Sequence, residues 1–462
     1  MSSRALLRFA FAAAFTLLLS LPVFAESHVR IVRLSYIEGG VTIDRNTGQF
    51  EKAIVNLPIT EGTKLRTSDG RAEVEFEDGS TMRLAPNSNV QFTKLSLRDS
   101  GGKISMADVQ NGTVYVDFAA AKHDELTLMF GNAKTTLTQA AHLRIDASDQ
   151  GSALAVFKGD VQVEGPSGEV QVKKNQTVSF ESGENAKAVV AKNIESEPLD
   201  GWDKKQSEYH QVYASNSYTN YSPYAYGTSD LSYYGNFFSA PGYGMLWQPY
   251  FIGAGWDPFM NGAWAFSPGF GYGWVSSYPW GWVPYHYGTW VFLPGYGWAW
   301  QPGGAWMPYY STPVLLNTPG GFKRPQAPAA PVKGTTILAV NRGPVTTFAN
   351  RSGSKIMIQN NSAGLGVPRG LSNIAKVSQQ VQTKGMVTQR VPSPNQSITP
   401  PRSMMQPSMR PGMQRGEGQT RPAAPPRMSS PPQAPPRMSS PPPPPPRMSM
   451  PAPPPPSSGP RK

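Results

Sequence analysis

The chain has 462 residues, a formal net charge of +12 and no cysteine. This length accommodates roughly two to four domains, and the lack of cysteine excludes a disulfide framework, a thiolate metal site and a cysteine nucleophile. Residues 311–462 carry 19 Lys/Arg and a single acid, Glu417, whereas residues 1–310 carry 23 Lys/Arg and 29 Asp/Glu. The basic character therefore belongs to the C-terminal third of the chain.

The N-terminus has the pattern of a secretory signal peptide. Arg4 and Arg8 precede the apolar run FAFAAAFTLLLSLPV, and the pattern Val23-Phe24-Ala25 precedes Glu26. We therefore predict that residues 1–25 are a signal peptide and that the mature protein is periplasmic or secreted. A retained membrane anchor is the alternative, but the run is short and contains polar residues and a proline. No later stretch has about 18 apolar residues without Gly/Pro breaks, so no further transmembrane helix is expected.

Residues 26–192 have the pattern of short β-strands, and RAEVEFEDGSTMRL (71–84) is the clearest hairpin. A three-residue loop at 77–79 pairs Val74 with Met82 and Ala72 with Leu84, which keeps the apolar side chains on one face. The same loop places Gly79 where a positive φ is required. No helical period is evident in this region, so we predict an all-β fold, either a sandwich or a roll.

The acidic side chains of this hairpin alternate with its apolar ones. Glu73, Glu75 and Glu77 therefore share the opposite face of the strand. We interpret them as the solvent-exposed face of a half-buried strand rather than as a catalytic pair.

Residues 65 to 165 contain, in this order, the stretches EDGSTMRLAPNSNVQF, VQNGTVYVDFA, NAKTTLTQAAHLRID and ALAVFKGDVQVEG. In these stretches the region resembles the FecR domain, the extracytoplasmic β-rich domain of FecR-type regulators. FecR anti-sigma regulators carry a cytoplasmic helical domain and a transmembrane helix before this domain, whereas here the predicted signal peptide stands directly before it. The resemblance therefore implies the fold but does not carry transcriptional signalling over to this chain.

Residues 193–230 are rich in Tyr, Ser and Asn without regular spacing, and we predict a partly ordered linker. A repeat follows, because GWDPFMNGAWAFSPGFGYGW (255–274) aligns with GWVPYHYGTWVFLPGYGWAW (281–300), and PGYGMLWQP (241–249) matches PGYGWAWQP (294–302). Each Pro-Gly pair suits a type II turn between two strands. Residues 231–310 are therefore predicted to form a module of β-hairpin repeats. They resemble an uncharacterised Trp/Gly/Pro-rich secreted domain that often follows FecR-like domains in bacteria, which implies no known activity.

The repeat module contains 28 aromatic residues and one charged residue, Asp257. A monomer does not tolerate that much exposed apolar surface, so most rings are expected to be core. This applies above all to the residues that occupy equivalent repeat positions: Trp264 and Trp290, and Trp274 and Trp300.

Ligand-binding candidates are the polar-tipped residues between the hairpins. They are Asp257, Tyr285, His286 and Tyr287, with a structural role as the alternative for His286. The uncharged amide, hydroxyl and aromatic surface around them suits a polysaccharide or a peptide.

Residues 311–462 are predicted to be a basic, Pro-rich disordered tail, in which PPRMSSPPQA, PPRMSSPPPP and PPRMSMPAPP follow one another. The tail is either a solvated extension or a loose attachment to anionic envelope polymers. A nucleic-acid partner is not expected, because the predicted signal peptide directs the chain out of the cytoplasm.

No recognised catalytic or metal-binding pattern occurs in the sequence, so we expect no enzymatic activity, no cofactor and no metal. The sequence indicates a non-enzymatic extracytoplasmic binding or scaffold protein of the bacterial cell envelope. The alternative is an accessory in FecR-type envelope signalling that senses a protein or ligand partner.

Overall fold

The structure, a computed structural model, describes residues 30–183, 186–214, 221–267, 271–307, 313–329, 335–343, 347–349, 355–371, 374–384 and 386–390. All of them belong to the first of the two compact units of the chain, Met1–Ser397 and Ile398–Lys462. The predicted signal peptide, 1–25, and the Pro-rich repeats of the predicted tail lie outside the described residues.

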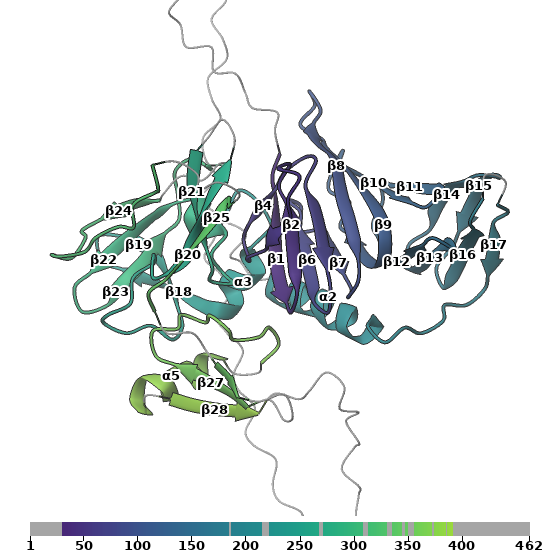
Figure 1. Cartoon of the computed structure of the whole chain (residues 1–462). Helices are drawn as coiled ribbons and strands as arrows, with labels where there is room; N and C mark the ends of the chain where they lie inside the picture. Colours follow the sequence, from purple (N-terminus) through teal and green to yellow (C-terminus); the bar gives the residue numbers. More distant parts are fainter. Residues whose placement is uncertain are drawn as a thin grey trace, which may run out of the picture. The chain divides into compact units, whose positions relative to one another are not determined.

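The N-terminal region is built from strands alone in the part that the structure describes up to residue 191. Seventeen strands form one continuous hydrogen-bonded system (Figure 1). Their bounds are β1 Val32–Glu38, β2 Val41–Asp44, β3 Glu51–Lys52, β4 Pro58–Ile59, β5 Lys64–Thr67, β6 Arg71–Glu75, β7 Thr81–Leu84, β8 Asn89–Leu97, β9 Lys103–Phe118, β10 Glu125–Phe130, β11 Ala133–Leu137, β12 Ala141–Ser148, β13 Gly151–Lys158, β14 Val161–Gly165, β15 Gly168–Val172, β16 Gln176–Glu181 and β17 Val189–Ala191.

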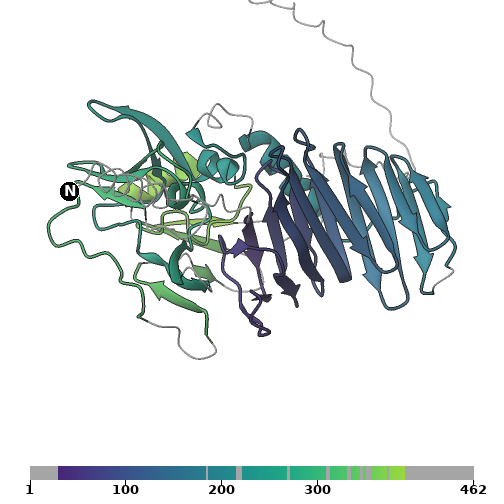
Figure 2. The same ribbon diagram turned by 90° about the horizontal axis from the view of Figure 1, so that it is seen from above.

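The long strand β9 joins the two layers of this system. Its first half pairs with β8 and, in parallel, with β10, and its second half pairs with β7 and β12. One layer thus has the order β3-β2-β5-β8-β9-β10-β11-β14-β15 and the other β4-β1-β6-β7-β9-β12-β13-β16-β17. Apolar side chains of both layers form one core, and the strands lie side by side in Figure 2. The predicted all-β class is confirmed, in its sandwich form.

The predicted β6–β7 hairpin is confirmed. Ala72 lies opposite Leu84 and Val74 opposite Met82, and Gly79 has a φ of +86°.

The prediction that the glutamates of this hairpin face solvent is wrong. Glu73, Glu75 and Glu77 are 0%, 1% and 7% exposed, respectively. The physical reason is that later parts of the chain cover this outer face of the sandwich.

Two helices, α2 (Asp200–Ala214) and α3 (Thr228–Tyr234), begin within the predicted linker, residues 193–230. The buried side of α2 consists of polar residues and a tyrosine: Asp203, Gln206, Ser207 and Tyr209. A helix with such a side packs against polar groups. Ser207 accepts a bond from Arg83 on β7 and donates one to Asp117 on β9, and Gln206 accepts a bond from Arg369.

The aromatic module consists of three hairpins in the described residues. They are β18 (Gly235–Ala240) with β19 (Gly244–Pro249), β20 (Asn261–Ser267) with β21 (Gly271–Ser276), and β22 (Thr289–Leu293) with β23 (Gly297–Gln301); the short helix α4 (Val283–His286) precedes the third hairpin. Trp264 pairs with Trp274, and Trp290 pairs with Trp300. The four tryptophans are 0–6% exposed, so equivalent repeat positions do hold core residues.

The predicted type II turns occur in the first and third hairpins. The amide of Tyr296 donates to the carbonyl of Leu293 at 3.0 Å, and Gly295 has a φ of +81°. The first hairpin has the same bond between Tyr243 and Ala240, at 3.1 Å. A positive φ at the third turn position is what makes glycine necessary there. The corresponding turn of the second hairpin, 268–270, lies outside the described residues.

The boundary of the predicted disordered tail at residue 311 is wrong. Later elements include β24 (Val314–Leu316), β25 (Ile337–Asn341), β26 (Thr347–Ala349), β27 (Lys355–Gln359), α5 (Ile374–Lys384) and β28 (Met386–Arg390). The first two extend the aromatic hairpins, because β24 pairs with β22 and β25 with β20. Hairpins with unpaired edges can recruit further strands, and the two recruited here are the short, mostly apolar runs VLL and ILAVN. Among the described residues, no helix has the length and apolar character that crossing a membrane requires.

Candidate functional site

A cluster of buried charged side chains lies between the sandwich and the chain that covers it. We call it the ionic cluster. Its members come from β1, β6, β7, α2, α3 and the segment before α5: Arg33, Glu73, Glu75, Arg83, Asp203, His210, Asp230 and Arg369.

Glu73 accepts bonds from four directions. Its carboxylate lies 2.8 Å from Arg83, 2.7 Å from Arg369 and 2.9 Å from His210. The hydroxyl of Ser35 donates to it at 2.7 Å. Burial alone would raise the pKa of Glu73, but His210, Arg369 and Arg83 outweigh it and hold that pKa well below its usual range. Glu73 is therefore a buried anion whose charge is compensated by three donors from separate parts of the chain.

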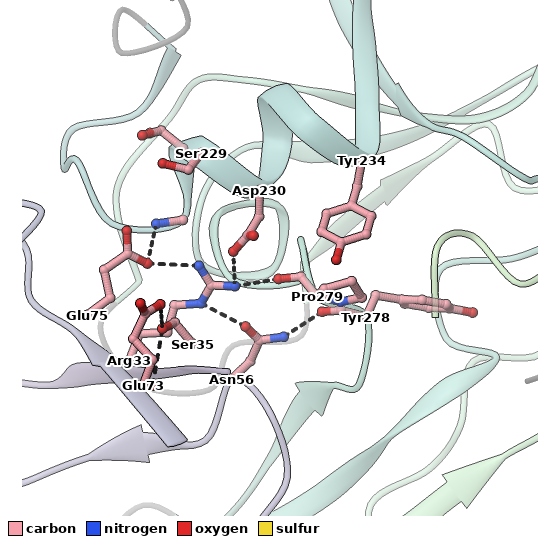
Figure 3. A network of polar contacts seen from close by, with 12 residues as sticks. Arg33, Ser35, Asn56, Glu73, Glu75, Ser229, Asp230, Tyr234, Tyr278 and Pro279 are labelled. Atoms are coloured by element: carbon pink, nitrogen blue, oxygen red, sulfur yellow. Dashed lines mark hydrogen bonds and ion pairs between the residues drawn. The ribbon is translucent and has the colours of Figure 1, made fainter. Parts of the chain in front are cut away.

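Arg33 forms the second centre of the cluster (Figure 3). Its guanidinium lies 2.7 Å from Asp230 and 3.0 Å from Glu75. Asp230 also receives bonds from Arg369 at 3.1 Å and from the hydroxyl of Tyr209 at 2.7 Å.

The two carboxyl groups around Arg33 respond differently to burial. Burial raises the pKa of Asp230, but the attraction of Arg369 and Arg33 is stronger, so the net pKa is lowered. Burial of Glu75 is only partly opposed by His210 and Arg33, and its pKa is raised. The negative charge of Asp230 is thus well compensated by neighbouring cations, whereas the charge of Glu75 is compensated only in part.

Hydrogen bonds from the same place reach the aromatic module. Asn56, in a positive-φ conformation of 64°, accepts a bond from Arg33 at 2.9 Å. Its amide donates to the carbonyls of Ser276 and Tyr278 at 2.9 Å and 2.7 Å. Arg33 itself donates to the carbonyl of Pro279 (Figure 3). The sandwich and the module are therefore joined by directional bonds as well as by apolar contact.

Helix α2 extends the network along the sandwich. Asp203 bonds Arg83 at 2.7 Å and His142 at 2.7 Å, and Ser207 donates to Asp117 at 3.1 Å. These partners explain why Asp203 can be buried, because burying a carboxylate without such partners would cost free energy of folding.

The chemistry open to this cluster is structural. The side chains of Glu73, Glu75, Asp203 and Asp230 are at most 2% exposed, and each is bound by protein donors. An acid or base with no accessible oxygen has no atom to offer to a substrate. Among the described residues no group of three or more His, Asp or Glu side chains is placed to hold a metal ion.

The predicted ligand-binding residues do not form one exposed face. Tyr285 is 3% exposed and donates to the carbonyl of Pro258. His286 is 8% exposed, and its Nδ1 lies 2.8 Å from the carbonyl oxygen of Met307. Burial lowers the pKa of His286 to about 4. The structural alternative for His286 is the one that fits this environment.

Asp257 and Tyr287 remain partly accessible. The Asp257 side chain is 15% exposed, accepts the amide of Phe259 at 2.8 Å and lies 3.4 Å from Arg342. Burial raises its pKa. Tyr287 is half-buried and packs against Trp300 and Trp306. Ligand binding by these two residues stays a prediction.

The ionic cluster was not found from the sequence, although one signal for it was present. The predicted hairpin register places Glu73 opposite Arg83, and an opposite-charge pair across a strand marks a possible buried network. The partner Arg369 lies 296 residues away from Glu73, and no local pattern connects the two.

The fold and the cluster describe an all-β sandwich that is fastened to an aromatic β-module. Residues 63–162 match the family model for the FecR protein, and residues 228–318 match a family of unknown function, DUF6600. The chain therefore contains a FecR domain followed by a DUF6600 domain, as both resemblances predicted.

Two crystal structures are also similar to part of this chain. Both are of a candidate anti-sigma factor from Parabacteroides distasonis ATCC 8503, at 1.65 Å and 2.50 Å resolution. They are 15% and 14% identical to this chain, with TM-scores of 0.25 and 0.26. The match covers 30% of this chain and 63% of theirs, less than two thirds of that protein. No curated protein sequence matches the chain.

Proposed function

We propose that this is a non-enzymatic, extracytoplasmic binding or scaffold protein of the bacterial cell envelope. The observation that carries the proposal is the ionic cluster, in which the charged face of the FecR domain is buried under the chain's own helices and Arg369. Because this face of the FecR domain contacts other segments of the same chain, it fixes the aromatic module to the domain and is not free to bind a separate partner. In this proposal the FecR domain presents the aromatic module to a partner.

The partner is a neutral envelope polysaccharide or a peptide. In support, residues 231–310 contain one charged residue, Asp257, so the surface that the module exposes is almost uncharged. Tyr287 and Trp306 are half-buried rings with 6.4 Å between their centroids, and Trp306 also stacks on His286 at 13°. Such rings can stack on a sugar or a peptide side chain. The basic residues beyond 390 add weak attraction to anionic envelope polymers.

Retention on an immobilised ligand tests the proposal. The mature chain from Glu26 is passed over envelope polysaccharide and over envelope peptides, and Tyr287→Ala is compared with Tyr243→Ala, a half-buried ring in another hairpin. We expect retention of the parent chain and weaker retention of Tyr287→Ala only. Equal retention of both variants would move the site away from Tyr287, and retention on neither material would contradict binding. N-terminal sequencing of the exported protein checks its location, with Glu26 as the expected first residue.

Accessory signalling of the FecR type is the second candidate, and the FecR match at 63–162 favours it. In this case the module would sense a partner and the FecR domain would transmit its binding. Genes for a sigma factor and an outer-membrane receptor beside this gene would favour signalling, whereas a polysaccharide-export cluster would favour scaffolding.

A further inference from the structure

The ionic cluster contains one more carboxyl group than it has arginines. Three of its members are arginines and four are Asp or Glu residues, and all seven side chains are at most 3% exposed. Solvent therefore does little to compensate the additional negative charge. A buried carboxylate without a full counter-charge is costly, and such a group is stabilised when it binds a proton.

The contacts within the cluster assign the poorly compensated charge to Glu75. Each of the other three carboxylates contacts at least two basic side chains: Glu73 contacts Arg83, Arg369 and His210, Asp230 contacts Arg33 and Arg369, and Asp203 contacts Arg83 and His142. Glu75 contacts one arginine, Arg33, at 3.0 Å, and Arg33 also contacts Asp230 at 2.7 Å (Figure 3). The other carboxyl oxygen of Glu75 lies 3.8 Å from Nδ1 of His210, which is longer than a hydrogen bond.

Charged groups from four elements face Glu75. They are Arg33 on β1, Glu73 on β6, His210 on α2 and Asp230 on α3. Burial has the largest influence and raises the pKa of Glu75; His210 and Arg33 oppose it, whereas Asp230 and Glu73 add to it. The neutral form of Glu75 is thus favoured both by its incomplete set of partners and by the two carboxylates beside it.

We propose that Glu75 is a pH-sensitive switch between the sandwich and the segments that cover it, whose neutral form keeps α3 closed on β6 and whose ionisation loosens α3. The amide of Gly227, the residue directly before α3, donates to Glu75 at 3.0 Å. Arg33, the arginine that contacts Glu75, also donates to the carbonyl of Pro279 in the aromatic module. The inference goes beyond the proposed function, because it concerns how the module is held and not which ligand the module binds.

The direction of the pH effect follows from the two states of the carboxyl group. In the unfolded chain Glu75 releases its proton near the ordinary pKa of 4.5, whereas the folded chain retains this proton to a higher pH. Stability that comes from the bound proton is therefore fully present below pH 4.5 and is lost as the pH rises through the folded-state pKa.

Hydrogen exchange of the α3 amides tests the inference in the mature chain from Glu26. Exchange is measured from pH 4.5 to about pH 8 and corrected for the intrinsic exchange rate, which gives the opening constant of α3. The test variant is Glu75→Gln, which keeps the size of the side chain and cannot ionise. The matched control is Glu73→Gln, two residues away on the same face of β6. Thermal melting checks that both variants are folded.

We expect the ratio of the parent's opening constant to that of Glu75→Gln to rise with pH, by at most about tenfold per pH unit for one proton. The ratio isolates Glu75, because groups such as His286 titrate in both proteins. Glu73→Gln should instead raise the opening constant roughly a hundredfold over the whole range, because it removes the carboxylate that Arg83 and Arg369 share.

A measurement on the parent chain alone adds an independent readout. Infrared spectroscopy should detect the carbonyl stretch of a buried neutral carboxylic acid above pH 4.5, and this band should disappear as α3 loosens. The inference is overturned if the ratio does not change with pH, if Glu75→Gln opens α3 as widely as Glu73→Gln does, or if the parent shows no neutral carboxyl band above pH 4.5.

Discussion

Arg369 shows how much of this structure depends on single side chains. Its guanidinium bonds Glu73 on β6, Asp230 on α3 and the carbonyl of Ser35 on β1, and lies 4.9 Å from the ring centroid of Tyr209. The two carboxylates have no solvent to replace these bonds. Removing one partner of a buried ion pair leaves the others uncompensated, which costs more than the pair itself contributes.

Arg369→Ala should therefore lower the free energy of unfolding by about 3–5 kcal/mol. The control is Arg342→Ala, because the Arg342 side chain is 42% exposed and forms an ion pair of 3.4 Å with Asp257 that solvent can reach. The control should cost less than about 1 kcal/mol. Urea unfolding of the two variants measures both effects. Similar midpoints for the two would mean that the ionic cluster does not hold the chain together.

His286 makes the stability depend on pH. Its folded-state pKa of about 4 lies below the ordinary value of 6.5, so the unfolded chain binds more protons between these values. Its stabilising contribution is present above pH 6.5 and is lost as the pH falls toward 4. The lowered pKa values of Glu73 and Asp230 act in the same direction at lower pH, whereas the raised pKa of Glu75 partly opposes them.

We expect the parent chain to lose about 3 kcal/mol between pH 6.5 and pH 4 from this histidine. His286→Phe keeps an aromatic ring beside Trp306 and should have a flatter profile over that range, although it loses the bond to Met307. Urea midpoints at several pH values give the comparison. A variant profile as steep as that of the parent would show that His286 is not the titrating group.

At the scale of elements, the repeated hairpins bury the same rings but not in identical surroundings. The indole Nε1 of Trp290 donates to Pro284 at 3.1 Å and that of Trp300 to Tyr287 at 2.7 Å. The indole nitrogen of Trp274, which is equivalent to Trp300, has no hydrogen-bond partner among the described residues. A repeat therefore specifies which side chain is core, while neighbouring segments decide how its polar atom is satisfied.

Trp290→Ala should destabilise the module by about 3–5 kcal/mol, because it removes a ring that is 0% exposed. Tyr296→Ala, which changes a ring that is 69% exposed in the same hairpin, should change stability by about 1 kcal/mol or less. Thermal melting compares the two. If Trp290→Ala melts like the parent chain, the assignment of its ring to the core is incorrect.

At the scale of the whole molecule, the fold extends well beyond the aromatic repeats. Ile358, Val377 and Val381 pack with the tryptophans, and Trp280 donates its indole proton to the carbonyl of Ala363 at 2.7 Å. These residues therefore complete the hydrophobic core to which the aromatic repeats contribute most of the rings. The sandwich, the module and residues 355–381 therefore depend on one another for stability.

A fragment of residues 26–390 should accordingly melt as the full chain does, whereas a fragment of residues 26–310 should melt at a much lower temperature. The shorter fragment lacks Arg369 and exposes the apolar surface that Val377 and Val381 cover. Limited proteolysis of the full chain should leave a core that ends near residue 390. A stable product ending near 310 would show that the later segment is dispensable.

The sequence by itself determined what depends on short-range periodicity. Alternation by two and turn chemistry specified the β6–β7 register, the positive φ of Gly79 and the aromatic hairpins. The FecR and DUF6600 resemblances follow from the same local patterns. Repetition also identified Trp290 and Trp300 as core, since each unit must bury the equivalent ring.

Only the tertiary structure decided which face of a strand meets water. The alternation that puts Glu73 opposite the apolar face is the same whether solvent or another segment covers it. Arg369 and α2 cover the face of β6 that carries Glu73. Both are far from Glu73 in the sequence, and no local sequence pattern predicts that they contact it. The positions of β24, β25 and the buried residues Ile358, Val377 and Val381 have the same origin, because the module supplies the strand edges and the aromatic rings that they contact. Burial depends on such long-range contacts, and local periodicity does not specify them.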